Sequence, residues 1–223
     1  MSGPHRLTTP RAVIFDFDLT LADSTAGFDA CHRLAAERLG LAPVSLEAVR
    51  RSIGTPLDIV VPRFFPSLSE SQVAEYIAAY QAHADHVMTP LTVMLPGAAD
   101  TVRHLNDAGL TLAIVSQKLR YRVEDVLQRE RIRDCFDVVL GGEDVPAFKP
   151  DPSGLLLALE RLAVAAGDAV YVGDTTIDAA AAANAGLRFV VVLSGPTTRD
   201  EFAPYATLAI LDGVAALPGL LGV

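Results

Sequence analysis

Cysteine is scarce in this sequence, which contains two cysteines among 223 residues. Cys31 and Cys135 stand far apart in the chain and lack the close spacing that metal ligands show. The pair therefore offers no ligand set for a structural metal. We expect both to be buried, reduced thiols that act as small apolar side chains.

Long hydrophobic runs are also absent, and no apolar stretch approaches the length needed to cross a bilayer. The N-terminal segment MSGPHRLTTPR has no apolar stretch either, which argues against a secretory signal. We therefore expect a cytoplasmic protein that has no membrane partner.

Positive charge is in short supply, because 18 Lys and Arg residues stand against 27 Asp and Glu residues. The formal net charge is −9, and the isoelectric point is about 4.9. No cluster of Lys or Arg interrupts this acidity, so we expect no nucleic-acid partner. If the substrate is an anion, local cations must overcome the negative field of the whole chain.

Short runs rich in Val, Ile and Leu are plentiful, and they alternate with helical patterns over most of the chain. These runs are almost uniformly apolar, which is typical of strands covered on both faces. The predicted strands span residues 12–17, 110–115, 138–141, 169–173 and 189–193. The predicted helices span residues 98–108, 120–130, 153–163 and 177–185. This order predicts an α/β fold with a parallel sheet between two layers of helices.

One region, from about residue 24 to residue 88, contains only helical patterns. A helix over 24–40 would end at Gly40, and Ser45 is placed to cap a helix over 46–51. Thr55-Pro56 is typical of an N-cap followed by proline, and Ser69 to Gln72 matches a capping box. We predict a helical module inserted after the first strand, with residues 21–91 as a cap and residues 1–20 and 92–223 as the core domain.

The first strand runs into two acids in the segment AVIFDFDLTLADS, at Asp16 and Asp18. Residues i and i+2 of a strand point the same way, so both carboxylates would share one face. The pair fits two interpretations equally well, as capping residues of a turn or as part of a site. Other strand ends favour the site, because they carry Ser116, Lys149 and the pair Asp174 and Asp178. In open α/β sheets, ligands bind at the carboxyl ends of the strands.

These residues form four ordered motifs that resemble those of the haloacid dehalogenase-like superfamily. Its DxDxT motif corresponds to residues 16–20, its strand-ending hydroxyl to Ser116, its lysine to Lys149, and its GDxxxD motif to residues 173–178. The fold implied is a Rossmann-like sheet with a helical C1 cap. Within the superfamily the layout is most similar to the phosphoglycolate phosphatase-like subgroup. Leu19 replaces the glycine commonly found before the threonine.

The resemblance implies a Mg²⁺-dependent phosphatase that works through an aspartyl-phosphate. Asp16 would be the nucleophile, Asp18 the acid and base, and Ser116 and Lys149 would hold the phosphoryl group. The implied metal-site residues are Asp16, Asp18 through its carbonyl, Asp174, and Asp178 at close range or through water. Candidate residues for substrate binding are Thr20, Arg50, Arg51, Gln117 and Lys118, the turn at residues 53–56, and Arg120 as an added positive charge.

Several alternatives stay open at this point. The substrate would be a small phosphorylated metabolite, but a pyrophosphatase or a promiscuous phosphatase for sugar phosphates or nucleotides also fits. Asp18 disfavours a dehalogenase, and Phe28, where mutases of the superfamily usually carry histidine, disfavours a phosphomutase. A receiver-type phospho-aspartate signalling domain shares some of the pattern but lacks the helical insertion. The sequence does not decide between a monomer and a homodimer.

Overall fold

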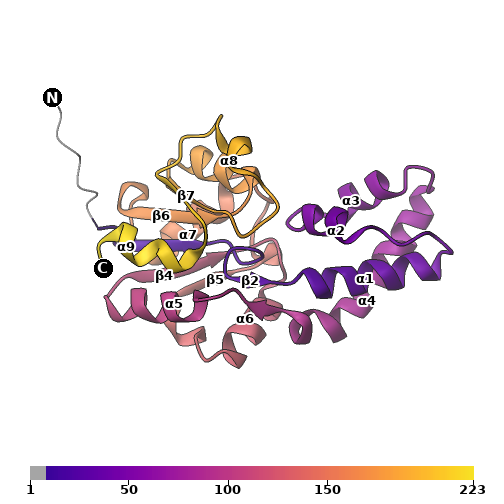
Figure 1. Ribbon diagram of the computed structural model, residues 1–223, viewed down its shortest axis with the longest axis horizontal. Helices are drawn as coiled ribbons and strands as arrows, with labels where there is room; N and C mark the ends of the chain where they lie inside the picture. The colour runs from indigo at the N-terminus through magenta and orange to yellow at the C-terminus, as the bar shows by residue number, and fades with distance from the viewer. Residues whose placement is uncertain (1–8) are drawn as a thin grey trace.

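A six-stranded parallel sheet forms the centre of the computed structural model, which describes residues 9–223 (Figure 1). The strand order is β5-β4-β1-β6-β7-β8, and every neighbouring pair is parallel. The strands are β1 (Ala12–Phe15), β4 (Thr111–Val115), β5 (Val138–Leu140), β6 (Ala169–Gly173), β7 (Arg188–Val192) and β8 (Ala209–Leu211). The first five confirm the predicted strands, whereas β8 is an edge strand that the sequence pattern did not predict.

Alternation along the strands divides the core into two layers. Val13 and Phe15 of β1 belong to one hydrophobic cluster, and Ala12 and Ile14 belong to the other. The first cluster includes residues of α5 (Ala98–Asp107), α6 (Arg120–Arg129) and α9 (Leu217–Leu221). The second includes residues of α7 (Ser153–Leu162) and α8 (Thr176–Ala185). Because both faces are covered, the strands are apolar at nearly every position, with Thr111 and Arg188 as polar first residues of β4 and β7.

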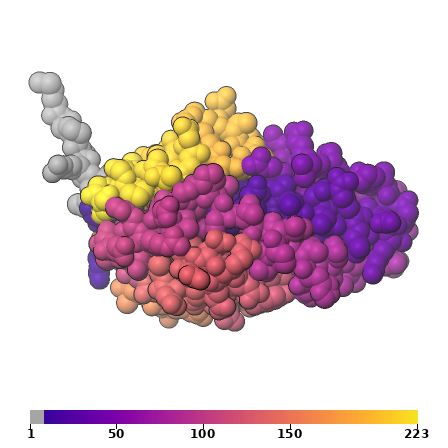
Figure 2. Space-filling view, turned by 60° about the horizontal axis from the view of Figure 1, so that its bottom comes forward, coloured from indigo at the N-terminus to yellow at the C-terminus, as the bar shows by residue number. Residues whose placement is uncertain are grey.

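Four helices lie between β2 (Ala22–Asp23) and β3 (Val93–Met94) and form one end of the molecule (Figures 1 and 2). They are α1 (Thr25–Arg38), α2 (Leu46–Ser52), α3 (Leu57–Phe64) and α4 (Glu70–Leu91). The chain enters this segment through β2 and leaves it through β3, which pair antiparallel. The predicted cap, residues 21–91, contains all four helices.

The predicted helix ends in this segment are largely confirmed. Ser45 accepts a hydrogen bond from the Ala48 amide, and Ser69 and Gln72 form the predicted capping box. At α3 the N-cap is Pro56 rather than Thr55, because Pro56 has an extended backbone (φ −57°, ψ 142°) and the helix begins one residue later. Within residues 9–223, no helix combines the length and the apolar character that a membrane span requires.

The two cysteines differ in their surroundings. Cys31 is fully buried in the core of the helical module, as predicted, and both cysteines are free. Cys135 is only half-buried, so the prediction of a second buried thiol is wrong. It ends a short 3₁₀ turn at the margin of the sheet core, where packing covers only part of its side chain.

His32 lies inside the helical module with 1% of its surface exposed. Its Nδ1 atom is 2.9 Å from the Tyr76 hydroxyl, and its ring centroid is 4.8 Å from that of Tyr80. Burial lowers the pKa of His32 to about 4, despite the opposing influence of Asp29. The imidazole is therefore neutral in the folded protein at neutral pH.

We expect His32 to make the fold sensitive to mild acid. In the unfolded chain an ordinary histidine binds a proton near pH 6.5, whereas folded His32 binds one only near pH 4. Between these values the unfolded state holds more protons, so stability falls as the pH falls, by about 2 kcal/mol between pH 7.5 and pH 5. Thermal unfolding of the wild type and His32→Gln over this pH range measures the effect. Parallel pH profiles of the two proteins would contradict it.

Candidate active site

The two acids of the first motif follow β1 directly. The Asp16 amide donates to the Val172 carbonyl at 2.9 Å and so continues the β1–β6 ladder by one residue. The chain then turns sharply, with Leu19 at φ 60°. This left-handed conformation favours glycine and costs a leucine roughly 1–2 kcal/mol. The buried Leu19 side chain, 1% exposed, helps to offset that cost by apolar burial.

Lys149 connects the acids at two strand ends. Its Nζ atom lies 2.8 Å from Asp16 Oδ1 and 2.7 Å from Asp178 Oδ1, and it also donates to the Tyr171 hydroxyl at 3.0 Å. Tyr171 in turn donates to Asp178 Oδ1 at 2.7 Å. Sequence reasoning missed Tyr171, although a lone phenol in the otherwise aliphatic strand AVYVG was an available signal.

Both carboxylate oxygens of Asp178 accept hydrogen bonds from other groups of the protein. Its Oδ2 atom accepts hydrogen bonds from the Thr175 amide and hydroxyl, at 3.1 Å and 2.5 Å, and its Oδ1 atom accepts from Lys149 and Tyr171. Burial alone would raise the pKa of Asp178, but Lys149 and these hydrogen bonds outweigh it and lower the pKa below its ordinary value. Asp178 is therefore a stable anion that caps α8 and orients Lys149.

Asp16, Asp174 and Asp178 form an acidic cluster whose ligand atoms lie within 4.8 Å of one another. Asp174 Oδ1 accepts from the Thr20 hydroxyl at 3.2 Å, whereas the buried Oδ2 has no protein partner. Burial, with the charges of the neighbouring acids, raises the pKa of Asp174 well above its ordinary value. Burial also raises the pKa of Asp16 to about 7, although Lys149 opposes this.

This cluster fits a small, hard cation. The oxygen of Asp174 without a partner is the atom that such an ion would engage, and carboxylate oxygens are the ligands that Mg²⁺ prefers. An added positive charge would also favour the ionised forms of Asp16 and Asp174, which burial disfavours. Asp178 already uses both oxygens within the protein, so it borders the cluster without a free oxygen.

Asp18 is held by side chains from two other parts of the chain. Its Oδ1 accepts from the Ser24 hydroxyl at 2.6 Å, and its Oδ2 accepts from Lys118 Nζ at 3.0 Å. Ser24 also lies 2.9 Å from the Thr92 hydroxyl, which joins the chain's entry to the helical module with its exit. Lys118, predicted as a substrate-binding residue, thus lies in the site but is paired with Asp18.

Ser116 and Gln117 lie where β4 ends. The Ser116 hydroxyl accepts from the Lys118 amide at 3.2 Å, and its residue is 4% exposed. Gln117 donates from Nε2 to the Lys149 carbonyl at 3.2 Å and so fixes the loop that carries the lysine. Both residues line the same pocket as Asp16.

The predicted arginines lie outside this pocket. Arg50 donates to the Ser194 carbonyl at 2.7 Å, Arg51 is 3.7 Å from Glu47, and Arg120 is 3.0 Å from Asp144. Thr20 also does not line the pocket, because it is fully buried beneath Asp174. The turn at residues 53–56 lines the pocket, as the sequence predicted. Phe28 lines it as well, which the sequence analysis did not predict.

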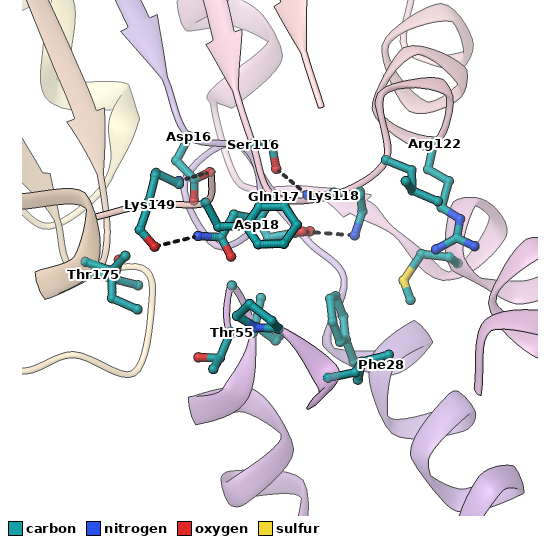
Figure 3. A pocket seen from close by; sticks show the side chains of 18 of the residues that line it. Asp16, Asp18, Phe28, Thr55, Ser116, Gln117, Lys118, Arg122, Lys149 and Thr175 are labelled. Carbon is teal, nitrogen blue, oxygen red and sulfur yellow. Dashed lines mark hydrogen bonds and ion pairs between the residues drawn. The ribbon is translucent and has the colours of Figure 1, made fainter. Parts of the chain in front are cut away.

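The pocket has a volume of about 430 Å³ and lies between the sheet edge and the helical module. Figure 3 shows Thr55 and Phe28 of the module facing Asp16, Asp18 and Lys149 across it. Carboxylates, a lysine and a hydroxyl thus share one pocket at the carboxyl edge of a parallel sheet.

Comparison with known proteins agrees with this geometry. Residues 13–192 match the sequence model of the haloacid dehalogenase-like hydrolases. The chain belongs to this family. Its relatives include the phosphoglycolate phosphatase of Pseudomonas fluorescens, 32% identical over 95% of this chain and 80% of the relative. The phosphoglycolate phosphatase of Pseudomonas putida is 33% identical over 98% of this chain and 84% of the relative.

Solved structures of haloacid dehalogenase-like proteins share the fold. One from Bacteroides fragilis, named a haloacid dehalogenase-like hydrolase, has a TM-score of 0.88 and 36% identity, covering 93% of this chain and 99% of that chain. The predicted superfamily, its α/β architecture and the likeness to phosphoglycolate phosphatases are therefore confirmed. The roles of individual residues rest on the geometry described above.

Gly195 offers a test of the acidic cluster that removes none of its carboxylate side chains. A Cβ at this position would overlap Asp174 Oδ2, so Gly195→Ala must displace that carboxylate. We expect the variant to need roughly 10–100-fold more Mg²⁺ for half-maximal activity, as is usual when a ligand's support is disturbed. Gly213→Ala is the matched control, because its Cβ would meet nothing within 4 Å. Equal Mg²⁺ requirements in both variants and the wild type would contradict a metal site at Asp174.

Proposed function

We propose that this protein is a Mg²⁺-dependent phosphatase that hydrolyses small phosphate monoesters through an aspartyl-phosphate. One observation carries the proposal: Lys149 bridges Asp16 and Asp178 beside the unpartnered oxygen of Asp174. Ser116 and Asp18 open onto the same pocket. The membership of the haloacid dehalogenase-like family, whose phosphatases generally use Mg²⁺, supports it.

The metal would be held by the carboxylates of Asp16 and Asp174 and the backbone carbonyl of Asp18, with Asp178 close by. When bound, it would neutralise part of the charge on the phosphoryl group and on the carboxylates. When Asp18 holds the proton that the first step requires, the three carboxylates of Asp16, Asp174 and Asp178 against Lys118 and Lys149 leave one negative charge, which one divalent cation more than offsets. A phosphate dianion would then no longer be repelled, despite the acidity of the whole chain.

The first chemical step would belong to Asp16. Its carboxylate oxygen forms a bond to phosphorus while the bond from phosphorus to the ester oxygen breaks. Lys149, 2.8 Å from Asp16 Oδ1, orients the nucleophile and lies beside the position of the phosphoryl oxygens. Ser116, at the end of the neighbouring strand β4, would donate its hydroxyl to one of those oxygens.

Asp18 would handle the protons. In the first step it gives a proton to the departing alkoxide, and in the second it takes one from the water that attacks the aspartyl-phosphate. The hydrogen bonds from Ser24 and Lys118 fix its carboxylate at the pocket's edge. The helical module that closes the pocket would exclude bulk water from the reactive intermediate.

Phosphoglycolate is the first substrate to test, because it is named in the relatives' functions. Pyrophosphate, sugar phosphates and nucleotides are the alternatives that the sequence left open. A carboxylate at Asp18 suits a reaction that must protonate an alkoxide, which favours phosphate ester cleavage over dehalogenation. Steady release of phosphate in excess over the protein would indicate a phosphatase. A receiver-type signalling domain would instead keep one phosphoryl group on its aspartate.

Asp16→Asn should abolish phosphate release while preserving the fold. The amide is close in shape to the carboxylate but is not a competent nucleophile, so we expect a loss of at least about 10³-fold in kcat. Phosphate release by the wild type and by Asp16→Asn measures the loss of activity. Thermal unfolding of both proteins tests whether the fold is preserved. A folded variant that keeps a tenth of the wild-type rate would rule out Asp16 as the nucleophile.

Removal of the metal should silence the wild type reversibly. We expect EDTA to abolish phosphate release and excess Mg²⁺ to restore it, because the buried acids would repel the substrate without the cation. Mg²⁺-saturated EDTA serves as the control for effects of the chelator itself. The assay uses phosphoglycolate, pyrophosphate and a sugar phosphate, ranked by kcat/KM. Full activity in EDTA would refute the metal requirement.

A further inference from the structure

The wall of the pocket opposite Asp16 is mainly apolar. The helical module contributes Phe28 from α1, Ile53 from the α2–α3 turn, Leu57 from α3, and Ile77 and Met88 from α4. Figure 3 shows Phe28 projecting from α1 toward the pocket, on the side away from the sheet.

Residues of the core domain extend this apolar surface. Leu119, Phe148 and Ile177 line the same pocket beside the polar residues of the sheet edge. Leu119 and Phe148 are 37% and 44% exposed, so these two keep apolar surface uncovered. The volume of about 430 Å³ lies within the range of roughly 300–1,000 Å³ typical of sites for larger organic ligands.

The direction of the reaction assigns this wall to the leaving group. In an in-line displacement, the departing oxygen lies on the far side of phosphorus from the attacking oxygen. Asp16 attacks from the sheet edge, so the alcohol part of the ester points toward the helical module. The substituents of the leaving alcohol would therefore contact Phe28, Ile77 and the residues beside them.

The cations of the pocket already have carboxylate partners. Among the described residues that line it, the cationic ones are Lys118, Lys149 and Arg122. Lys118 is paired with Asp18, and Lys149 with Asp16 and Asp178. Arg122 pairs with Asp85 at 2.5 Å and also donates to the Tyr121 hydroxyl at 3.0 Å.

A second anionic group on the substrate would therefore be poorly matched. It would compete with Asp18 or Asp85 for a cation, and it would share the pocket with the carboxylate of Asp58. Burying a charge without a partner is costly, whereas burying apolar surface is favourable. The same argument applies to pyrophosphate, whose leaving group is itself a highly charged phosphate.

We propose that the helical module selects phosphate monoesters of uncharged, apolar alcohols, of branched-alkyl or aryl-methyl size. This proposal rests on the proposed phosphatase function and narrows its substrate class. Phosphoglycolate would then be a weaker substrate than an uncharged ester of the same shape. Phe28, Ile77 and Met88 would be the specificity-determining side chains.

Isobutyl phosphate provides the matched comparison, because its branched end has the same number of heavy atoms as the carboxylate end of phosphoglycolate. With Mg²⁺ present, we expect kcat/KM to be at least about tenfold higher for isobutyl phosphate than for phosphoglycolate. Benzyl phosphate should be hydrolysed at least as efficiently as isobutyl phosphate, since the pocket has room for the ring. Phosphate release measures all three.

A pair of variants localises the effect to the pocket. Ile77→Ala should lower kcat/KM for isobutyl phosphate by roughly three- to tenfold and change it for phosphoglycolate by less than about twofold. Ile59→Ala is the same substitution in the same module, at a residue that is 43% exposed and does not line the pocket. It should leave both values unchanged. Thermal unfolding confirms that both variants are folded.

The outcomes distinguish the preference for apolar leaving groups from the phosphatase function itself. A higher kcat/KM for phosphoglycolate than for isobutyl phosphate would overturn the leaving-group proposal and leave the phosphatase function intact. Equal losses on both substrates in Ile77→Ala would also overturn it, because a structural defect does not distinguish leaving groups. If phosphate were released from none of these three esters, and from neither the sugar phosphate nor the pyrophosphate of the metal-removal assay, the phosphatase function would be overturned as well.

Discussion

The concentration of negative charge at one edge of the sheet is the constraint on which the rest of the structure depends. Asp16, Asp174 and Asp178 are nearly inaccessible to water and lie within one small cluster, where like charges repel. Lys149 offsets part of that repulsion by reaching two of the three acids. The arrangement survives because adjacent parallel strands fix the acids from beneath, and because buried hydroxyls donate to them. The pairing of β1 with β6 therefore also sets the positions of Asp16 and Asp174, which follow these strands.

The fold could be predicted from the sequence wherever the chain is buried on both sides. Strands such as β1 and β6 are uniformly apolar, and their order with the helices specifies a parallel sheet. The missed elements are those without such a pattern. The edge strand β8 has only half-buried residues, and β2 and β3 have two residues each, too few for any periodicity. Tertiary pairing creates these strands, and local sequence does not encode them.

The site was predictable to the extent that strand ends determine it. Topology alone brings Asp16, Ser116, Lys149 and Asp174 to one edge, as their positions after strands indicated. The partners of these residues were not predictable in the same way. Lys118 pairs with an acid 100 residues away in sequence, and Arg50 contacts a loop beyond β7 rather than the pocket. The Arg50 contact depends on how the helical module sits against the sheet, and the Lys118 contact depends on how two loops of the core domain meet. No spacing in the sequence reveals either.

The antiparallel pair β2–β3 brings the two ends of the helical module together. Because the chain leaves the core and returns to it through neighbouring residues, Ala22 opposite Met94 and Asp23 opposite Val93, the helices between them form a cassette with adjoining ends. The six-stranded sheet completes its hydrogen-bonded ladder without any strand from this cassette. A change in the length or packing of the cassette therefore leaves the pairing of the six strands, and with it the spacing of the acids at the sheet edge, intact.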